Sequence, residues 1–482
     1  MTAAGTLHQA LHAFSWFVIA YTAFVDATYA FYTLLALFGV RHHLHKRSRE
    51  RMEQIFQSRL VPPISIILPA YNEGETIVDS VRGMMRQLYS QFEIVVVNDG
   101  SKDATLQRLI EAFGLEPVGK TYVDSIPAAP VRGVYASYEY QRLIVVDKQN
   151  GGSKADAINA GINAASYPLV CACDADSLLE EDALLQLVMP MLDRLAFVPA
   201  SGGVVRALNG SAVRRGTIQE IRLPRTPIEI FQVVEYLRAF LTGRTAQSLL
   251  NIMLIVSGAF GLFNKAVVKE VGGYRASALG EDFELIVRIT RHLHEVGRAF
   301  EVVFVPQTVC WTMVPHDWKT LGKQRGRWHR GLLQTLQWHR AMLVNPRYGR
   351  TGAIGLGSFL AIEVFGPIIE FLGYIYFVLA AALHAIDYRL AALFFIVSVL
   401  GGVFLSLGAL LLEEVSFHRY SHWREVAKLT LYAIAENFGY RQLTLWWRLR
   451  ATFEHVRGAR MSWGEMQRKG FQRAESSERT PS

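Results

Sequence analysis

Residues 64–73 decide the fold class of this chain, and they read Ile64-Ser65-Ile66-Ile67-Leu68-Pro69-Ala70-Tyr71-Asn72-Glu73. The stretch begins as a β-branched apolar run and ends in polar side chains, as a buried strand does where it leaves a sheet. The pattern recurs downstream, with apolar runs at 92–97, 143–146 and 169–173 and helical stretches at 76–88, 103–113 and 153–165. This alternation predicts an α/β fold whose parallel-rich sheet has helices on both faces.

Polar residues follow each of these four strands at its carboxyl end. They are Tyr71, Asn72 and Glu73 after the first, Asp99 after the second, Asp147 and Lys148 after the third, and Asp174 and Asp176 after the fourth. Sheets of this kind bind ligands at the carboxyl ends of their strands, so we expect one shared site. The connection 114–141, which carries Pro and Gly, is interpreted as a surface excursion.

The second half of the sheet region is less regular. Its pattern predicts a helix at 180–194, a strand at 198–205, a Gly- and Arg-rich loop at 209–225 and a helix at 228–250. Asn264 is expected to cap a short helix, and Glu281-Asp282 to open a helix that reaches residue 295. Residues 318–343 predict a basic, aromatic helix suited to a membrane surface.

Apolar residues make up 51% of the 482 residues and concentrate at 13–40 and 353–447. Residues 14–40 exceed a signal-peptide core and lack a basic leader, which favours a retained transmembrane helix. Residues 366–386 and 390–412 each have spanning length, whereas 353–365 is either interfacial or half of a helix broken at Pro367. Residues 425–447 carry several polar side chains, so they lie in the interface or span with that face turned inward.

The basic residues cluster beside the apolar segments. The run from His42 to Arg51 follows the first apolar stretch directly, so the region after it is expected in the cytosol. The same placement accounts for the net charge of +8 without nucleic acid, for which we recognise no binding module. The three cysteines, Cys171, Cys173 and Cys310, are expected to be buried and unpaired.

These patterns divide the chain into four parts. We expect a transmembrane helix with a basic juxtamembrane segment at 1–50, a cytosolic α/β domain at 51–345, transmembrane and interfacial helices at 346–448 and a basic cytosolic tail at 449–482.

The pair Asp174 and Asp176 suits a divalent cation. Carboxylate oxygens two residues apart after a strand can bind Mg²⁺ or Mn²⁺, which prefer carboxylate and phosphate oxygens. In isolation the pair would equally fit a solvated turn or a helix cap.

Other residues would complete a site for group transfer from a nucleotide diphosphate. Lys154, Arg325 and Arg327 can hold a diphosphate, and Asp282, with Glu281 as the neighbouring candidate, can act as a base. Each has a simpler explanation, because acidic residues stabilise helix N-termini and arginines can face a membrane. Trp328 offers a flat apolar face to a pyranose or to the membrane interface, and Tyr71, Asn72, Glu73 and Asp99 can bind the nucleoside.

The order of these motifs resembles the processive family 2 glycosyltransferases, which include the cellulose, chitin, hyaluronan and poly-N-acetylglucosamine synthases. The resemblance is carried by Pro69 to Glu73, Asn98 to Ser101, Asp174 to Asp176, Glu281-Asp282 and Gln324 to Trp328. It implies a GT-A fold (the nucleotide-diphospho-sugar transferase fold), an inverting displacement, and a polymer threaded outward through the enzyme's own helices. It also implies a multi-pass protein of the bacterial inner membrane, with the catalytic domain in the cytosol.

Carried over by motif, Asp99 contacts uracil, Asp174 and Asp176 serve the donor and the metal, and Asp282 is the base. Gln324, Arg327 and Trp328 then hold the diphosphate and the acceptor terminus. Ser257 and Gly258 belong to a stretch that is similar to the acceptor loop but lacks the Cys of cellulose synthases, which weakens a cellulose assignment.

Three classes of function remain open from the sequence. The first is a polymerising enzyme that uses a UDP-sugar, UDP-GlcNAc or UDP-Glc, a growing polysaccharide acceptor and a lipid bilayer, with export or modifying partners unknown. The second is a single-transfer enzyme acting on a lipid carrier. The third is a membrane receptor or assembly subunit without turnover, against which the intact Asp282 and Trp328 argue.

Overall fold

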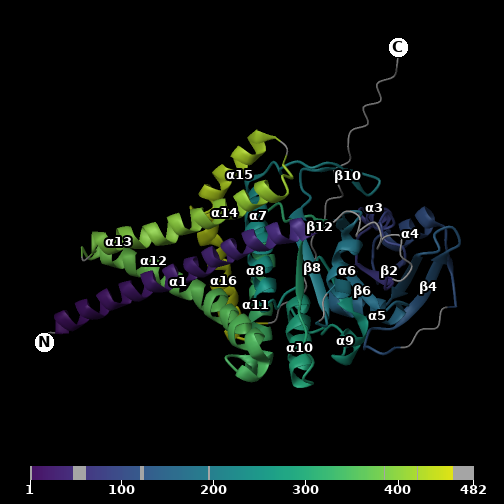
Figure 1. The fold of residues 1–482 in the computed structure, drawn as a ribbon, viewed down its shortest axis with the longest axis horizontal. Helices are drawn as coiled ribbons and strands as arrows, with labels where there is room; N and C mark the ends of the chain where they lie inside the picture. Colours follow the sequence, from purple (N-terminus) through teal and green to yellow (C-terminus); the bar gives the residue numbers. More distant parts are fainter. Residues whose placement is uncertain are drawn as a thin grey trace, which may run out of the picture.

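The computed structural model describes residues 3–46, 61–119, 124–193, 196–384, 386–420 and 422–459. Within them, a sheet domain adjoins a set of long helices that project from one side of it (Figure 1). The sequence predictions for the basic stretch 47–51 and for the tail beyond residue 459 lie outside the described residues.

The sheet of the described residues has ten strands, and its four central strands are the predicted ones. The order is β3-β4-β5-β2-β1-β6-β11-β8-β12-β7. The bounds are β3 (Leu115–Pro117), β4 (Val131–Ser137), β5 (Leu143–Lys148), β2 (Phe92–Asp99), β1 (Ile64–Ala70), β6 (Leu169–Cys173), β11 (Phe260–Asn264), β8 (Ala200–Ala207), β12 (Val303–Thr312) and β7 (Ser177–Leu179). Neighbours among β5, β2, β1 and β6 are parallel, as the alternating pattern predicts.

Helices α3 (Ile77–Met84), α4 (Thr105–Phe113) and α5 (Lys154–Ala164) follow these strands, again as predicted. Helix α5 packs closely on the sheet at Gly161, where a Cβ would lie 2.4 Å from Cγ2 of Ile67. A larger residue there would displace the helix. The strand ends and the N-terminus of α5 are therefore held in one fixed arrangement.

The interpretation of 114–141 as a surface excursion is wrong in part. The segment contributes β3 and β4, which extend the sheet at one edge, with β4 antiparallel to β5. Both faces of β4 are only partly covered, so its sequence lacks the continuous apolar run by which the buried strands are recognised. The loop 209–225 likewise contains a short hairpin of β9 (Ala212–Arg214) and β10 (Thr217–Glu220).

The remaining elements of the sheet domain match their predictions closely. They are α6 (Ala183–Asp193), α7 (Pro227–Tyr236), the π-helix η1 (Leu237–Arg244), α8 (Thr245–Leu249), α9 (Lys265–Glu270), α10 (Glu281–Glu295) and α11 (Trp318–Trp338). The Asn264 side chain caps α9 by accepting from the amides of Ala266 and Val267. The three cysteines are buried and free.

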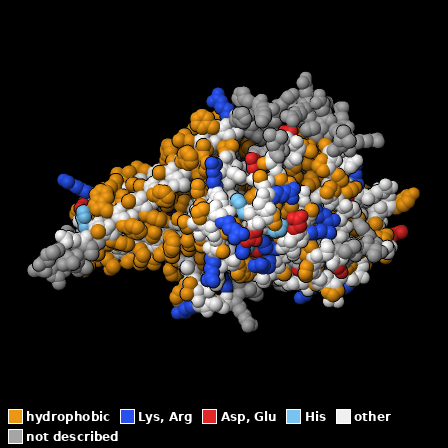
Figure 2. Space-filling view, turned by 60° about the horizontal axis from the view of Figure 1, so that its bottom comes forward, with side chains coloured by type: hydrophobic (Ala, Val, Ile, Leu, Met, Phe, Trp, Pro, Cys, Tyr) orange, Lys and Arg blue, Asp and Glu red, His pale blue; other side chains and the backbone are white. Residues whose placement is uncertain are grey.

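Three helices among the described residues are long and apolar enough to cross a membrane: Leu11–Arg41, Thr351–Ala382 and Tyr388–Ser416. The first lies within α1 (Ala3–Lys46). The second joins η4 (Thr351–Leu356), η5 (Phe359–Val364) and α12 (Phe365–Ala382), and the third joins α13 (Tyr388–Phe395), η6 (Ile396–Leu400) and α14 (Gly401–Ser416). Large apolar side chains such as Val378 and Phe404 are exposed on them, and this surface forms the orange region of Figure 2.

Two predictions about the C-terminal third need correction. The stretch 353–365 is neither a separate interfacial segment nor half of a helix broken at Pro367, because the helix runs through this proline. Residues 425–447 are not one segment: α15 (Trp423–Ala435) and α16 (Tyr440–Val456) meet at Gly439, which has φ +99°. Helix α16 packs on α11, where a Cβ at Gly322 would lie 2.9 Å from Trp447.

Candidate active site

The loops after β1 and β2 are tied together at the carboxyl edge of the sheet. The Asn72 amide donates to Oγ of Ser101 at 3.0 Å, and the Lys102 amide donates to Oδ1 of Asn72 at 2.8 Å. Asn72 has a positive φ of 57°, which an asparagine tolerates better than most residues. Glu73 is buried beside them and accepts from the Thr76 hydroxyl, while Tyr71 is half-buried.

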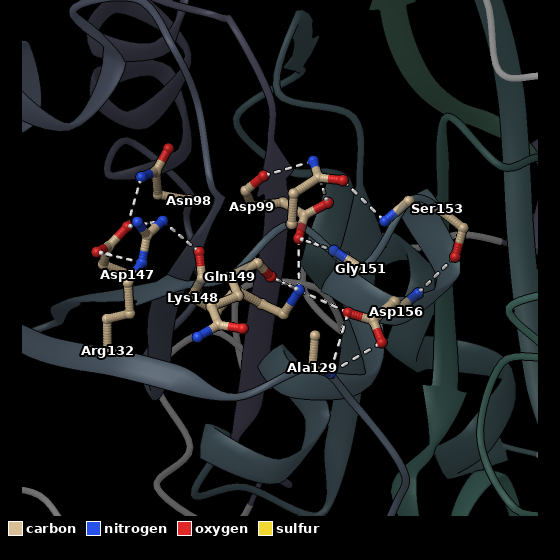
Figure 3. A network of polar contacts seen from close by, with 12 residues as sticks. Asn98, Asp99, Ala129, Arg132, Asp147, Lys148, Gln149, Gly151, Ser153 and Asp156 are labelled. Atoms are coloured by element: carbon tan, nitrogen blue, oxygen red, sulfur yellow. Dashed lines mark hydrogen bonds and ion pairs between the residues drawn. The ribbon is translucent and has the colours of Figure 1, made fainter.

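Asp99 is fixed by a buried network at the same edge (Figure 3). The fully buried Lys148 forms ion pairs with Asp99 and, at 2.5 Å, with Oδ1 of Asp156. The Gly151 amide donates to Oδ1 of Asp99 at 3.1 Å, and the Asn150 side chain donates to Oδ2 at 3.3 Å. Burial raises the pKa of Asp99 even though Lys148 opposes the shift. The sequence placed Lys148 at a strand end but did not indicate this role.

Lys154 joins residues from four separate motifs. Its ammonium forms an ion pair with Asp174 and donates to the Gly258 carbonyl at 2.7 Å. The Gly258 amide in turn donates to Oδ2 of Asp282 at 2.8 Å. Burial lowers the pKa of Lys154, but Asp174, Glu281 and Asp282 outweigh it and the pKa ends above its ordinary value. Lys154, Asp174, Gly258 and Asp282, which come from four separate predicted motifs, therefore lie in one cluster.

The two aspartates after β6 have the donor chemistry of a divalent-cation site. Burial, and then the charge of Asp174, raise the pKa of Asp176 to about 7. A cation would relieve this crowding of like charges. Within the described residues, no group of three or more His, Cys, Asp or Glu side chains could hold a metal. Two carboxylates nevertheless fit Mg²⁺, which proteins commonly bind through one or two carboxylates together with substrate phosphates.

Asp282 and Glu281 lie at the N-terminus of α10, where close glycine contacts bring the surrounding segments together. A Cβ at Gly258 would lie 3.1 Å from Oδ2 of Asp282, and one at Gly331 of α11 would lie 2.7 Å from the Gly280 amide nitrogen. Oδ1 of Asp282 accepts from the Phe283 amide at 2.8 Å. These contacts place the predicted base between the Ser257-Gly258 loop and α11.

Glu281 is buried at the same helix end and is the more enclosed of the two acids. Burial raises its pKa, an effect opposed by Lys154, reinforced by Asp282 and opposed by Arg327. The charges of Lys154 and Arg327 act on Glu281. Asp282 also acts on Lys154, and its Oδ2 accepts in addition from the Gly258 amide.

Arg325 and Arg327 of α11 face different ways. Residues two apart in a helix do not share a face, whereas Gln324, Arg327 and Trp328 do. Arg327 donates to the Leu279 carbonyl at 3.3 Å, next to the acidic pair. Arg325 is 6% exposed and binds Glu235 at 2.7 Å, which also accepts from the Tyr440 hydroxyl. The structure thus brings Arg327, but not Arg325, to the acidic cluster.

Trp328 is 41% exposed, and the Arg325 guanidinium carbon lies 4.3 Å from its ring centroid. A cation held at that distance fixes the ring while much of its surface stays accessible. Gln324 accepts from Arg325 at 3.1 Å on the same helix. An exposed, fixed indole is the geometry that stacking against a sugar ring requires.

Sequence reasoning missed Arg244, at the end of η1. Burial lowers its pKa to about 10, an effect opposed by the charge of Asp282 and then of Tyr236. It donates to the Ile255 carbonyl at 3.2 Å, close to the acceptor loop. The only signal in the sequence is one arginine within the helical stretch 228–250, which also contains Arg238.

Comparison with known proteins shows the family to which the chain belongs. The model of the family described as "Glycosyltransferase like family 2" matches residues 62–331, more than half of the chain. The chain is 27% identical over 292 residues to the poly-β-1,6-N-acetyl-D-glucosamine synthase of Staphylococcus aureus strain COL, covering 61% of this chain and 58% of the relative. The synthase of Staphylococcus epidermidis is 28% identical over 274 residues, covering 56% of this chain and 55% of the relative. The chain thus spans little more than half the length of these relatives.

A solved structure shares the fold. The mannosyltransferase PcManGT of Pyrobaculum calidifontis, in complex with GDP-Man and Mn²⁺, aligns with a TM-score of 0.50 and 19% identity over 88% of this chain and 99% of its own. At that identity the likeness concerns the fold alone.

Proposed function

The chain belongs to the glycosyltransferase-like family 2 and has the expected GT-A-like fold, and from this premise we propose that it polymerises sugar from a UDP-sugar into an exopolysaccharide. In this proposal the reaction is inverting and processive, and it takes place in a cytosolic domain of residues 51–345. Residues 346–448 anchor that domain in the bacterial inner membrane and pass the polymer outward.

The observation that carries the proposal is the chain of contacts through Lys154. One buried ammonium touches Asp174 of the strand-end pair and the Gly258 carbonyl, and the Gly258 amide touches Asp282. A transferase must hold the leaving diphosphate and the acceptor hydroxyl on opposite sides of one anomeric carbon. This contact chain links a cation, proposed for the donor side, to a carboxylate, proposed for the acceptor side.

The residues divide the reaction between them. The acceptor oxygen forms a bond to the anomeric carbon while the bond from that carbon to the diphosphate oxygen breaks, and UDP leaves. Asp282 takes the proton of the acceptor hydroxyl, a contribution of typically 10²- to 10⁴-fold. Lys154 and Arg327 stabilise the negative charge on the diphosphate. Trp328 and Gln324, with Ser257 and Gly258, hold the acceptor terminus.

The nucleoside is proposed to lie against the loops after β1 and β2, at Tyr71, Asn72, Glu73 and Asp99. The network around Lys148 leaves Asp99 with one oxygen held strongly by Lys148 and Gly151 and the other held by Asn150 at 3.3 Å. A weak partner is more easily exchanged for a uracil N–H, because the net cost of replacing one hydrogen bond with another is small.

A cation is proposed at Asp174 and Asp176. When bound, Mg²⁺ or Mn²⁺ would neutralise the charge that develops on the leaving diphosphate. Removal of divalent cations with EDTA should stop transfer, and readdition should restore it. Transfer at an undiminished rate in EDTA would contradict the proposed cofactor.

The donor is proposed to be UDP-GlcNAc, with UDP-Glc as the second candidate. The relatives reported above are poly-β-1,6-N-acetyl-D-glucosamine synthases, which favours the acetamido sugar. The test is a panel of UDP-sugars given to the purified full-length protein in lipid nanodiscs, with UDP release as the readout. If no UDP-sugar of the panel gave UDP release above background, the result would contradict the proposal.

Product size separates polymerisation from single transfer. With radiolabelled donor in excess over enzyme, a processive enzyme makes long products while most acceptor remains unextended. A single-transfer enzyme would instead give one labelled lipid of fixed size, and that result would favour the lipid-carrier alternative.

A further inference from the structure

A cavity lies at the opposite end of α10 from the acidic pair. It has a volume of about 450 Å³ and is lined by Asn251, His294, Arg298, Phe300, Arg350 and Thr351, among others. Asp282 and His294 are twelve residues apart on α10, which separates them by roughly 18 Å along the helix axis. The cavity is therefore distinct from the proposed active site.

The cavity is positively charged. Arg298 and Arg350 line it, and its lining contains no Asp or Glu. Arg298 is held by its stacking on Phe197, with the guanidinium carbon 3.4 Å from the ring centroid. Within the part of the chain that the structure describes, no carboxylate forms an ion pair with either arginine. Both arginine residues are exposed, and their guanidinium groups can donate to an anion.

Neutral hydrogen-bonding groups complete the wall. Nε2 of His294 lies 2.8 Å from Oγ1 of Thr351, and Nδ2 of Asn251 donates to the Phe300 carbonyl at 3.3 Å. Burial lowers the pKa of His294, so its imidazole is neutral near pH 7. The charge of the cavity at that pH comes from the two arginines alone.

The cavity lies where two of the apolar helices end. Thr351 is the first residue of the candidate span Thr351–Ala382. On the other side, the cavity residue Asn251 follows α8. Leu249, the last residue of α8, packs on Gly39, where a Cβ would lie 2.5 Å from Cδ1 of Leu249. Gly39 is near the end of the candidate span Leu11–Arg41. Figure 2 shows Lys and Arg side chains gathered at the border of the exposed apolar surface. This border is the level at which lipid headgroups would meet the protein.

We propose that this cavity binds the phosphate of an anionic phospholipid, with Arg298 and Arg350 as its ligands. Guanidinium groups match phosphate oxygens in geometry, and basic pockets beside membrane helices on the cytoplasmic side are suited to anionic headgroups. The volume is within the range of small-molecule sites and is large enough for a glycerophosphate headgroup. The acyl chains would extend along the apolar surface of the Thr351–Ala382 helix. The proposal does not depend on the sugar-transfer activity.

The test compares lipid binding by two double variants of the full-length protein. Arg298→Gln with Arg350→Gln removes both cavity cations. The matched control, Arg340→Gln with Arg347→Gln, removes two exposed arginines that are close to Arg350 in sequence but do not line the cavity. Each protein is delipidated in detergent and titrated with phosphatidylglycerol or phosphatidylcholine of equal chain length, and bound lipid is counted by native mass spectrometry.

The wild type and the control variant should bind phosphatidylglycerol more tightly than phosphatidylcholine. The cavity variant should bind phosphatidylglycerol about 30-fold more weakly, the factor expected for two arginines near a lipid headgroup. An equal loss of phosphatidylglycerol affinity in both double variants would show that the lipid responds to general surface charge, and it would overturn the proposed site. Millimolar inorganic phosphate should not displace the lipid, and full displacement would identify a site for free phosphate instead of a lipid.

Discussion

Substitution of Asp282 by Asn tests the proposed base most directly. The Asp282 carboxylate accepts two hydrogen bonds, from the Gly258 amide at 2.8 Å and from the Phe283 amide at 2.8 Å. Asparagine has the same size but offers one oxygen and one NH₂ group. It can satisfy one of the two amides, and it cannot take a proton from an acceptor hydroxyl at neutral pH.

The expected loss has two parts of different size. Removal of a positioned base lowers the rate by about 10²- to 10⁴-fold, which corresponds to roughly 3 to 5 kcal/mol of barrier. Loss of one hydrogen bond to a charged group costs about 1.5 to 3 kcal/mol of local stability. The second part acts on the acceptor loop around Gly258, so it should appear as a modest fall in Tm and not as weaker UDP binding.

The assay is UDP release by the full-length protein with saturating donor and acceptor, together with UDP affinity and Tm for each variant. Glu281→Gln is the matched control, since it makes the same chemical change one residue away. Because the charges of Lys154 and Arg327 act on Glu281, this variant should change donor binding more than the chemical step. Turnover within about threefold of wild type for Asp282→Asn, with transfer abolished in Glu281→Gln, would refute the assignment and identify Glu281 as the base.

Trp328→Ala should raise the KM for an oligosaccharide acceptor up to about tenfold, the value of a lost aromatic contact, with little change in the KM for donor; equal effects on both would contradict the stacking role. Arg327→Gln should weaken donor binding, whereas Arg325→Gln should mainly lower the Tm because that guanidinium is buried against Glu235. The reverse pattern would contradict the different roles given to the two arginines. His329 tests the pH dependence of stability, because burial, with Arg448 and His455, lowers its pKa to about 3 from the ordinary 6.5. The unfolded chain takes up this proton first, so stability should fall as pH drops from 6.5 toward 3, by up to about 1.4 kcal/mol per pH unit. His329→Gln should flatten that slope in denaturant titrations, and an unchanged slope would show that other groups cause it.

The sequence predicted the central sheet because its signals are local. Four β-branched runs, each ending in polar residues, are sufficient to identify parallel buried strands. The register that pairs Asn98 with Asp147 is known only from the structure. The Asn264 cap and the start of α10 at Glu281 were equally readable, since caps depend on one or two neighbouring residues. The apolar spans were readable from composition and length alone.

The strands at the edge of the sheet were not readable in this way. Strand β4 is half-exposed and is stabilised by its partner β5, so its sequence alone does not distinguish it from a loop. The division of 425–447 into α15 and α16 depends on Gly439 and on the packing of α16 against α11. The packing of α16 against α11 joins residues more than one hundred positions apart, such as Gly322 and Trp447.

The sequence by itself determined which chemical groups stand at the strand ends and in what order, because those groups are fixed by residue type and by the period of the strands. Only the tertiary structure decided which of them meet. Lys154 joins Asp174 to Gly258, Arg327 turns toward the acids while Arg325 turns away, and a cavity between Arg298 and Arg350 opens at the ends of two apolar helices. The physical reason is that hydrogen bonds, ion pairs and cavities depend on distances of a few ångströms between segments that the chain itself separates by tens or hundreds of residues.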